Sequence, residues 1–211
     1  MSHATVPGCG TGASLSDMTS APLLVSRRRL VLADLIPGTR LRDAALVVGG
    51  AGLTGLAAQV SVHIPSISPV PFTLQTLAVL LTGAALGSVR GLLSMSLYLL
   101  SGGFGLPWFA NHTSGFSGAS FGYVVGFVVA AGIVGELARR GNDRHVMSAI
   151  GLMAVGDAIL LTIGTIWLAN DLHVSMAKAI DLGVTPFLIG DALKLTIAAL
   201  ALPAAWKLVR G

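Results

Sequence analysis

The chain has 211 residues, of which 54% are hydrophobic and 10% are charged, with a mean hydropathy of +0.82 and a formal net charge of +4. A soluble domain carries roughly 25% charged residues, so this chain has too little charge to cover a surface that faces water. The composition excludes an ordinary cytosolic enzyme, a nucleic-acid-binding protein and a disordered chain, and it predicts an all-α, multi-pass integral membrane protein.

The first 40 residues differ from the rest of the chain. Residues 1–20 are rich in glycine, serine, threonine and alanine and have no apolar period, which is typical of a disordered segment. The basic run 27–29 precedes the short apolar stretch 30–33, which is too short for a signal peptide. We therefore expect a disordered cytoplasmic tail over residues 1–40 and a membrane domain over residues 41–211, with a cleaved start as the alternative.

Apolar blocks separated by short polar breaks follow from Leu41 onward. At ~20 residues per span plus short loops, this length allows roughly six transmembrane helices. We expect them over residues 43–63, 72–87, 91–100, 120–139, 146–170 and 186–207. The second and third are short and interrupted by glycine, so a tilted or broken helix is expected there.

The distribution of lysine and arginine tests this map independently. If the amino terminus lies inside, 11 of the 13 cations fall in inner segments: Arg27, Arg28, Arg29, Arg40, Arg42, Arg90, Arg139, Arg140, Arg144, Lys207 and Arg210. Of the other two, Lys178 falls in an outer loop and Lys194 falls inside the last helix. Cytoplasmic loops carry an excess of lysine and arginine, so the pattern predicts that both termini are cytoplasmic.

Two charged residues lie three positions apart in the last predicted helix. Asp191 and Lys194 therefore share one face, about 7 and 12 Å below a helix start at Pro186. An ionisable group inside the hydrocarbon costs at least ~2.5–3.5 kcal/mol, so each is a candidate functional residue. Either the charges are neutralised within the protein, by each other or by Asp157 bonded to Lys194, or they bind a ligand with N–H donors and an anionic group.

Neutral polar groups are expected near the same outer face. The proline-rich loop 63–71 leads to Gln75 at the top of the second helix, and Tyr123 lies near the start of the fourth helix, where it could donate its hydroxyl. The loop 101–118 is the longest outer connection, and loops of this length are usually lids or binding loops, or are disordered. Its aromatic residues fit either an interfacial belt or stacking on a ligand.

Small residues four positions apart mark a packing face on the first helix: Ala45 with Gly49, and Ala51 with Gly55. Such pairs let another helix approach closely. The face packs either within the chain or against a partner subunit, and the pattern leaves both alternatives open.

Neither a metal site nor an enzyme is expected. His63, His112 and His173 fall in three outer loops without ligand spacing. The segment Gly-Phe-Ser-Gly over residues 115–118 matches the pattern around the nucleophile Ser117 of rhomboid-type intramembrane proteases. That chemistry needs a histidine base in a later helix, and the last helix contains none. An intramembrane hydrolase is therefore the weaker alternative, and no cofactor is predicted.

Four segments carry a resemblance to a known family: Pro69–Leu80 (PVPFTLQTLAVL), Gly105–Ala110 (GLPWFA), Gly122–Phe127 (GYVVGF) and Pro186–Lys194 (PFLIGDALK). In order and with compatible spacing, they resemble the biotin transporter BioY family, the substrate-binding S components of energy-coupling factor vitamin transporters. The resemblance covers residues 41–210. Where the family commonly has Gly-Pro-Thr-Gly-Gly-Tyr, residues 118–123 read Gly-Ala-Ser-Phe-Gly-Tyr.

The resemblance implies a six-helix, S-component-like fold that captures biotin at the outer face of the bacterial cytoplasmic membrane. The candidate ligand-binding residues are Asp191, Lys194, Gln75, Asn111, Ser120 and Tyr123. An S component for another vitamin, such as thiamine or riboflavin, is the alternative.

The resemblance also implies partners. The family's first helix carries small residues that face a transmembrane coupling subunit, which works with two ATPase subunits. The candidates for that interface are Ala45, Gly49, Ala51 and Gly55. Some members work without the energising module.

Overall fold

The computed structural model describes residues 30–36, 38 and 40–210, and most of this part of the chain is helical. In chain order the elements are η2 (Leu32–Leu35), α1 (Arg40–Gln59), β1 (Ser61–Val62), β2 (Phe72–Thr73), α2 (Gln75–Leu86), α3 (Ser88–Gly103), η3 (Ala110–His112), α4 (Phe121–Arg139), α5 (Val146–Asp171), α6 (Met176–Gly183) and α7 (Leu188–Arg210). The two short strands pair antiparallel, with Ser61 opposite Thr73. The all-α class is confirmed.

All six helices expected from the sequence are present. Within the described residues, four of them (α1, α4, α5 and α7) are long and apolar enough to cross a membrane. The second and third, α2 and α3, have 12 and 16 residues. Since α2 rises only about 18 Å, it is shorter than the ~30 Å hydrocarbon core of a bilayer. The protein is a membrane protein in which two short helices sit among four long ones.

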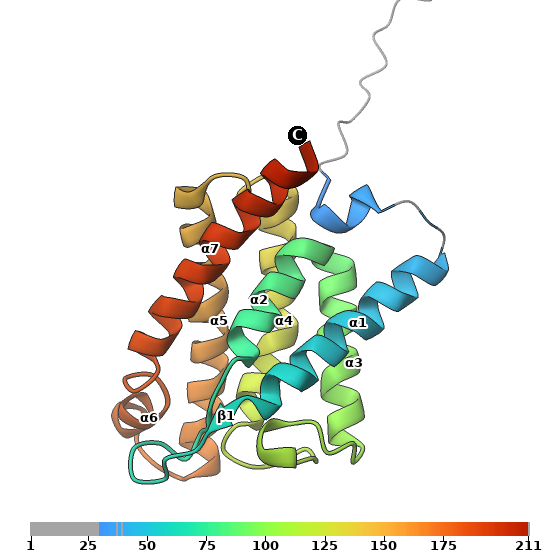
Figure 1. Ribbon diagram of the computed structural model, residues 1–211. Coiled ribbons are helices and arrows are strands. Elements are labelled where there is room, and N and C mark those ends of the chain that lie inside the picture. The colour runs from blue at the N-terminus through green and yellow to red at the C-terminus, as the bar shows by residue number, and fades with distance from the viewer. Residues whose placement is uncertain (1–29, 37, 39, 211) are drawn as a thin grey trace, which may run out of the picture.

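Helix α4 lies at the centre of the bundle (Figure 1), where it packs against α2, α3 and α5. The outer helices contact this centre from two sides, α1 through α3 and α2, and α7 through α5 and α2. Close approach depends on glycine at the α2–α3 corner. Gly87 forms that turn with φ 82°, and a Cβ on Gly135 of α4 would lie 2.4 Å from the Gly87 carbonyl carbon. A larger residue at position 135 would push α4 away from the corner.

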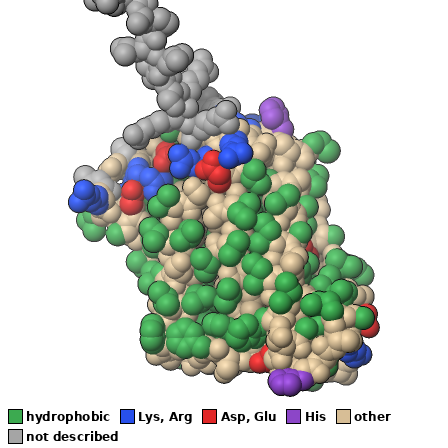
Figure 2. Space-filling model, turned by 180° about the vertical axis from the view of Figure 1, so that it is seen from behind, with side chains coloured by type: hydrophobic (Ala, Val, Ile, Leu, Met, Phe, Trp, Pro, Cys, Tyr) green, Lys and Arg blue, Asp and Glu red, His purple; other side chains and the backbone are tan. Residues whose placement is uncertain are grey.

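The molecule has two chemically different ends. We call the end with η2 and the C-terminus the terminal end, and the end with β1, α6 and the loop 104–120 the loop end (Figure 1). At the terminal end, Arg90 pairs with Asp34 and Asp43 at 2.8 and 3.2 Å. Figure 2 shows Lys, Arg, Asp and Glu gathered at this end, above a flank covered by hydrophobic side chains. An apolar flank of this kind is suited to contact with lipid.

The sequence did not predict η2, α6, η3 or the two short strands, and two of these elements, η2 and α6, change the expected map. Residues 1–29 of the predicted tail lie outside the described residues, but Val31 and Ala33 are buried in the core. The expected boundary at residue 40 is therefore corrected, because packed structure already includes η2. Helix α6 precedes α7, and the side chain of Ser175 accepts from the backbone N–H of Lys178 at its start. Both elements are short, so neither produces a long apolar run that hydropathy can detect.

Candidate functional site

A cavity lies toward the loop end, between the first turns of α2, α4 and α7, the middle of α5, and the segments before α2 and α4. The space open to the centre of a water molecule is about 40 Å³, a few times what one water needs. Its apolar lining consists of Val70, Pro71, Phe109, Ala110, Val124, Phe127, Leu160, Leu161 and Phe187. Its polar lining consists of Thr73, Gln75, Thr76, Ser120, Tyr123, Asp191 and Lys194. A mostly apolar cavity with a few convergent polar groups is typical of a small-molecule site.

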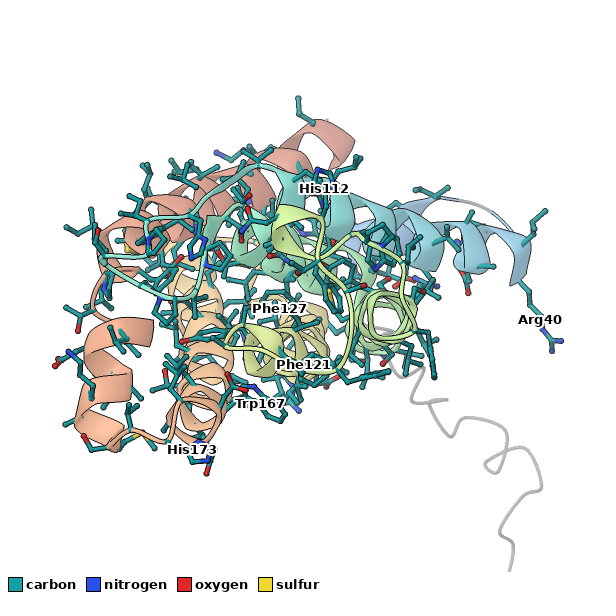
Figure 3. All side chains as sticks on the ribbon, turned by 90° about the horizontal axis from the view of Figure 1, so that it is seen from below. Arg40, His112, Phe121, Phe127, Trp167 and His173 are labelled. Carbon is teal, nitrogen blue, oxygen red and sulfur yellow. The ribbon has the colours of Figure 1, made fainter. Side chains whose placement is uncertain are left out.

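Aromatic rings from several elements lie in the lining of this cavity, among them Phe109, Phe127 and Phe187, and other rings pack nearby. Phe72 stacks on Phe187 with 4.6 Å between ring centroids, which joins β2 to the start of α7. In the view from the loop end (Figure 3), Phe127 lies near the middle of the bundle, and Phe121 lies beside Trp167. Because these rings come from distant parts of the chain, the fold brings together an apolar wall that no local segment supplies.

Asp191 and Lys194 form an ion pair of 2.9 Å in the first turns of α7, on one helix face as expected. The side chain of Asp191 is 3% exposed and that of Lys194 is 14% exposed. Thr76 of α2 joins the pair: its hydroxyl accepts from Lys194 Nζ at 3.1 Å and donates to Asp191 Oδ1 at 3.4 Å. Asp191 Oδ2 is buried and has no hydrogen-bond partner among the described residues. A residue of the cavity lining thus has a carboxylate oxygen with unmet hydrogen-bonding capacity.

A second acid, Asp157, lies one turn of α5 from the lining residues Leu160 and Leu161. It is 7% exposed, and its Oδ1 also lacks a partner among the described residues. The sequence left open whether Lys194 pairs with Asp157 or with Asp191. In the structure the ion pair of Lys194 is made with Asp191. The cavity lining thus holds one buried acid and one base, and a second buried acid lies one turn away along α5.

Gln75 begins α2 and is held by hydrogen bonds at both ends of its amide. Its Nε2 donates to the hydroxyl of Tyr98 on α3 at 2.8 Å, and its Oε1 accepts from the hydroxyl of Thr73 at 3.2 Å. Tyr98 donates in turn to the carbonyl oxygen of Trp108 at 3.1 Å. Sequence reasoning missed Tyr98, because a tyrosine inside an apolar helix carries no signal of its partners.

Tyr123 lines the cavity, but its hydroxyl is not free to donate. It donates to the carbonyl oxygen of Gly183 at 2.8 Å, which ties α4 to α6. A Cβ on Gly164 would lie 2.3 Å from the Tyr123 ring, so glycine leaves the room that the ring occupies. The expectation that Tyr123 donates to a ligand is therefore corrected: its oxygen can offer a lone pair instead.

The remaining two ligand-binding candidates are placed differently. Ser120 precedes α4 and lines the cavity. Asn111 lies in η3 with φ 58°, and its Oδ1 accepts from Ser61 Oγ at 2.9 Å. The neighbouring residue Ala110 lines the cavity, whereas Asn111 is not among the described residues that do. Five of the six candidates thus share one cavity, and Asn111 instead bonds to the residue that opens β1.

The four small residues of α1 divide between two faces. Ala51 and Gly55 are buried, and a Cβ on Gly55 would lie 3.0 Å from the Trp108 ring. Ala51 and Gly55 therefore pack within the chain. The prediction that they belong to a partner interface is corrected. Ala45 and Gly49 are exposed, and a Cβ on Gly49 would have nothing within 4 Å.

The histidine and serine patterns do not form chemical sites within the described residues. His112 ends η3 and His173 lies in the loop after α5, at different sides of the molecule (Figure 3). No group of three His, Cys, Asp or Glu side chains in that part of the chain could hold a metal ion. Ser117 is exposed in the loop before α4, and no hydrogen bond joins it to a described histidine.

The chain is similar to known proteins over most of its length. A sequence model of the BioY family matches residues 27–211. The "Probable biotin transporter BioY" of Pyrococcus horikoshii is 37% identical over 162 residues, which cover 75% of this chain and 93% of that protein. The "Biotin transporter BioY" of Thermotoga maritima is 37% identical over 137 residues, or 64% of this chain and 79% of that protein.

The fold also has a counterpart among solved structures. The crystal structure of the S-component for biotin from an ECF-type ABC transporter matches with a TM-score of 0.71 at 19% sequence identity. The match covers 80% of this chain and 92% of that one. The chain therefore shares its overall fold with that S-component.

Proposed function

The chain belongs to the BioY family, and from this premise we propose that it captures biotin at the loop-end cavity, as the S component of an energy-coupling factor transporter. It is a transport protein and not an enzyme. Relatives named biotin transporters support this assignment. The observation that carries it is the buried Asp191–Lys194 pair, which lines the cavity and leaves one carboxylate oxygen unpartnered.

The polar groups of the cavity are suited to the two ends of biotin. The ureido ring carries N–H donors, and the valerate chain ends in a carboxylate. Asp191 Oδ2 and Gln75 Oε1 are acceptors for the N–H groups, and the Lys194 ammonium is the counter-charge for the carboxylate. The apolar walls suit the ring and chain between them.

Binding on this proposal requires an exchange of partners. The two charges are in contact at 2.9 Å, so they cannot meet opposite ends of biotin without moving apart. Ligand N–H donors replace Lys194 at Asp191, and the flexible four-carbon stem of Lys194 turns its ammonium toward the ligand carboxylate. The narrow cavity opens as this happens, because about 40 Å³ holds only a few waters.

We propose that the loop end faces outward and that both termini are cytoplasmic. The described cations other than Lys178 and Lys194 belong to the terminal end, in agreement with the excess of lysine and arginine in cytoplasmic segments. We further propose that the exposed residues Ala45 and Gly49 of α1 meet a transmembrane coupling subunit, which works with two ATPase subunits.

A vitamin panel tests the proposed ligand. Purified protein in detergent is heated with biotin, thiamine or riboflavin, and its melting temperature is measured. A ligand that binds the native state stabilises it by mass action, so biotin is expected to raise the melting temperature and the other two are not. Stabilisation by thiamine or riboflavin without an effect of biotin would overturn the assignment.

A further inference from the structure

We propose that Tyr98 is a positioning residue that fixes which end of the Gln75 amide is offered to a ligand. The inference rests on the proposed function, since it concerns the same cavity. Tyr98 lies on α3, is fully buried and does not line the cavity, whereas Gln75 does. Its hydroxyl lies 2.8 Å from Gln75 Nε2 and 3.1 Å from the Trp108 carbonyl oxygen.

The direction of these hydrogen bonds follows from proton counting. A backbone carbonyl oxygen can only accept, so the single hydroxyl proton of Tyr98 goes to Trp108. Tyr98 can then only accept from Gln75. The Gln75 group beside it must therefore be the amide NH₂, and a flipped amide would place two proton-free oxygens against each other.

The other end of the amide leads to the same orientation independently. The Thr73 hydroxyl accepts from the backbone N–H of Gln75 at 3.2 Å. Its own proton is then available for Gln75 Oε1, also at 3.2 Å. Thr73 lines the cavity and Tyr98 does not, so Oε1 is held on the cavity side. A carbonyl oxygen has two lone pairs, and one remains for an N–H donor of the ligand.

The Trp108 carbonyl anchors this chain of hydrogen bonds. It also accepts from Gln59 Nε2 of α1 at 3.1 Å, which fills its second lone pair. The Trp108 indole N–H donates back to the Tyr98 carbonyl oxygen at 3.1 Å, and the two rings lie 5.2 Å apart. Helices α1, α2 and α3 and the loop before η3 thus fix the polarity of one side chain in the cavity.

A double-mutant cycle tests the role of Tyr98. Tyr98→Phe keeps the ring contacts but frees the Gln75 amide to flip, so biotin is expected to bind about tenfold more weakly. Gln75→Met keeps the volume but removes the amide, and it weakens binding by itself. In the Gln75→Met background, Tyr98→Phe is expected to change the dissociation constant by less than about twofold, because Tyr98 acts through Gln75.

The Gln75→Met background is the matched control. An effect of Tyr98→Phe that comes from packing alone persists in that background, whereas an effect that acts through the Gln75 amide is lost. Wild-type affinity in Tyr98→Phe, or losses that multiply in the double variant, would overturn the positioning role. If the wild-type protein binds no biotin, the proposed function fails. Melting temperatures of the ligand-free variants then decide this inference: coupled losses at Gln75 and Tyr98 support it, and additive losses overturn it.

Discussion

At the scale of single residues, the site depends on a buried ion pair whose partners have unmet hydrogen-bonding capacity. Removing charges from water is expensive, and an apolar pair of the same volume is often at least as stable. Asp191 and Lys194 nevertheless occur together at 2.9 Å beside a cavity, with Oδ2 of the acid unpartnered. A pair that served stability alone would gain from satisfying that oxygen. The arrangement is better suited to exchange with a ligand.

Lys194→Ala tests the counter-charge. The variant is expected to bind biotin at least about tenfold more weakly than wild type, because a charged hydrogen bond to the carboxylate is lost. Biotin amide, which has no carboxylate charge, is expected to bind the variant and the wild type with similar affinity. Dissociation constants from isothermal titration calorimetry give both comparisons.

The amide controls for damage to the cavity. If Lys194→Ala weakens biotin and biotin amide by the same factor, the lysine holds the site together and does not recognise the carboxylate. If the variant and the wild type bind biotin with equal affinity, Lys194 has no role in binding biotin.

Residue-level prediction from the sequence succeeded where helix geometry alone decides the outcome. The spacing of Asp191 and Lys194 places them on one face of any helix, and the structure has them in contact. The partners of Tyr98 and Tyr123 are a carbonyl of the loop before η3 and a carbonyl of α6. Such contacts depend on tertiary packing, so the sequence predicted a free hydroxyl at Tyr123 and no role for Tyr98.

At the scale of elements, α1 presents two different faces. Ala51 and Gly55 pack inward, where Gly55 leaves room for the Trp108 ring. Ala45 and Gly49 point away from the bundle together with exposed leucine and valine residues of α1. Small residues on an exposed membrane face allow another helix to approach closely, which supports a partner on this side.

Gly49→Leu tests the partner face. A Cβ at position 49 would have nothing within 4 Å, so the protein is expected to fold and to bind biotin with unchanged affinity. A leucine there would hold a partner helix away, so uptake of labelled biotin at nanomolar concentration by cells that contain the coupling subunit is expected to fall at least about tenfold. Gly151→Leu is the matched control, since Gly151 of α5 is also exposed with nothing within 4 Å of its Cβ. Unchanged uptake in Gly49→Leu, or equal loss in both variants, would contradict a partner at Gly49.

At the scale of the whole molecule, hydropathy predicted α1, α4, α5 and α7 because bilayer thickness sets a minimum length for an apolar run. Helices α2 and α3 were predicted as shorter apolar segments interrupted by glycine. The six predicted spans correspond to α1–α5 and α7. The same criterion explains the omissions. Helix α6 has 8 residues and η2 has 4, and both are fixed by packing rather than by passage through the membrane. The cavity could not be predicted in shape, because its lining comes from segments far apart in the chain.

The most direct measurement is an experimental structure of the protein with biotin bound. The account predicts biotin in the loop-end cavity, with a ureido nitrogen within hydrogen-bond distance of Asp191 and the carboxylate facing Lys194, whose contact with Asp191 is broken. Biotin bound elsewhere, with the 2.9 Å ion pair intact, would contradict it.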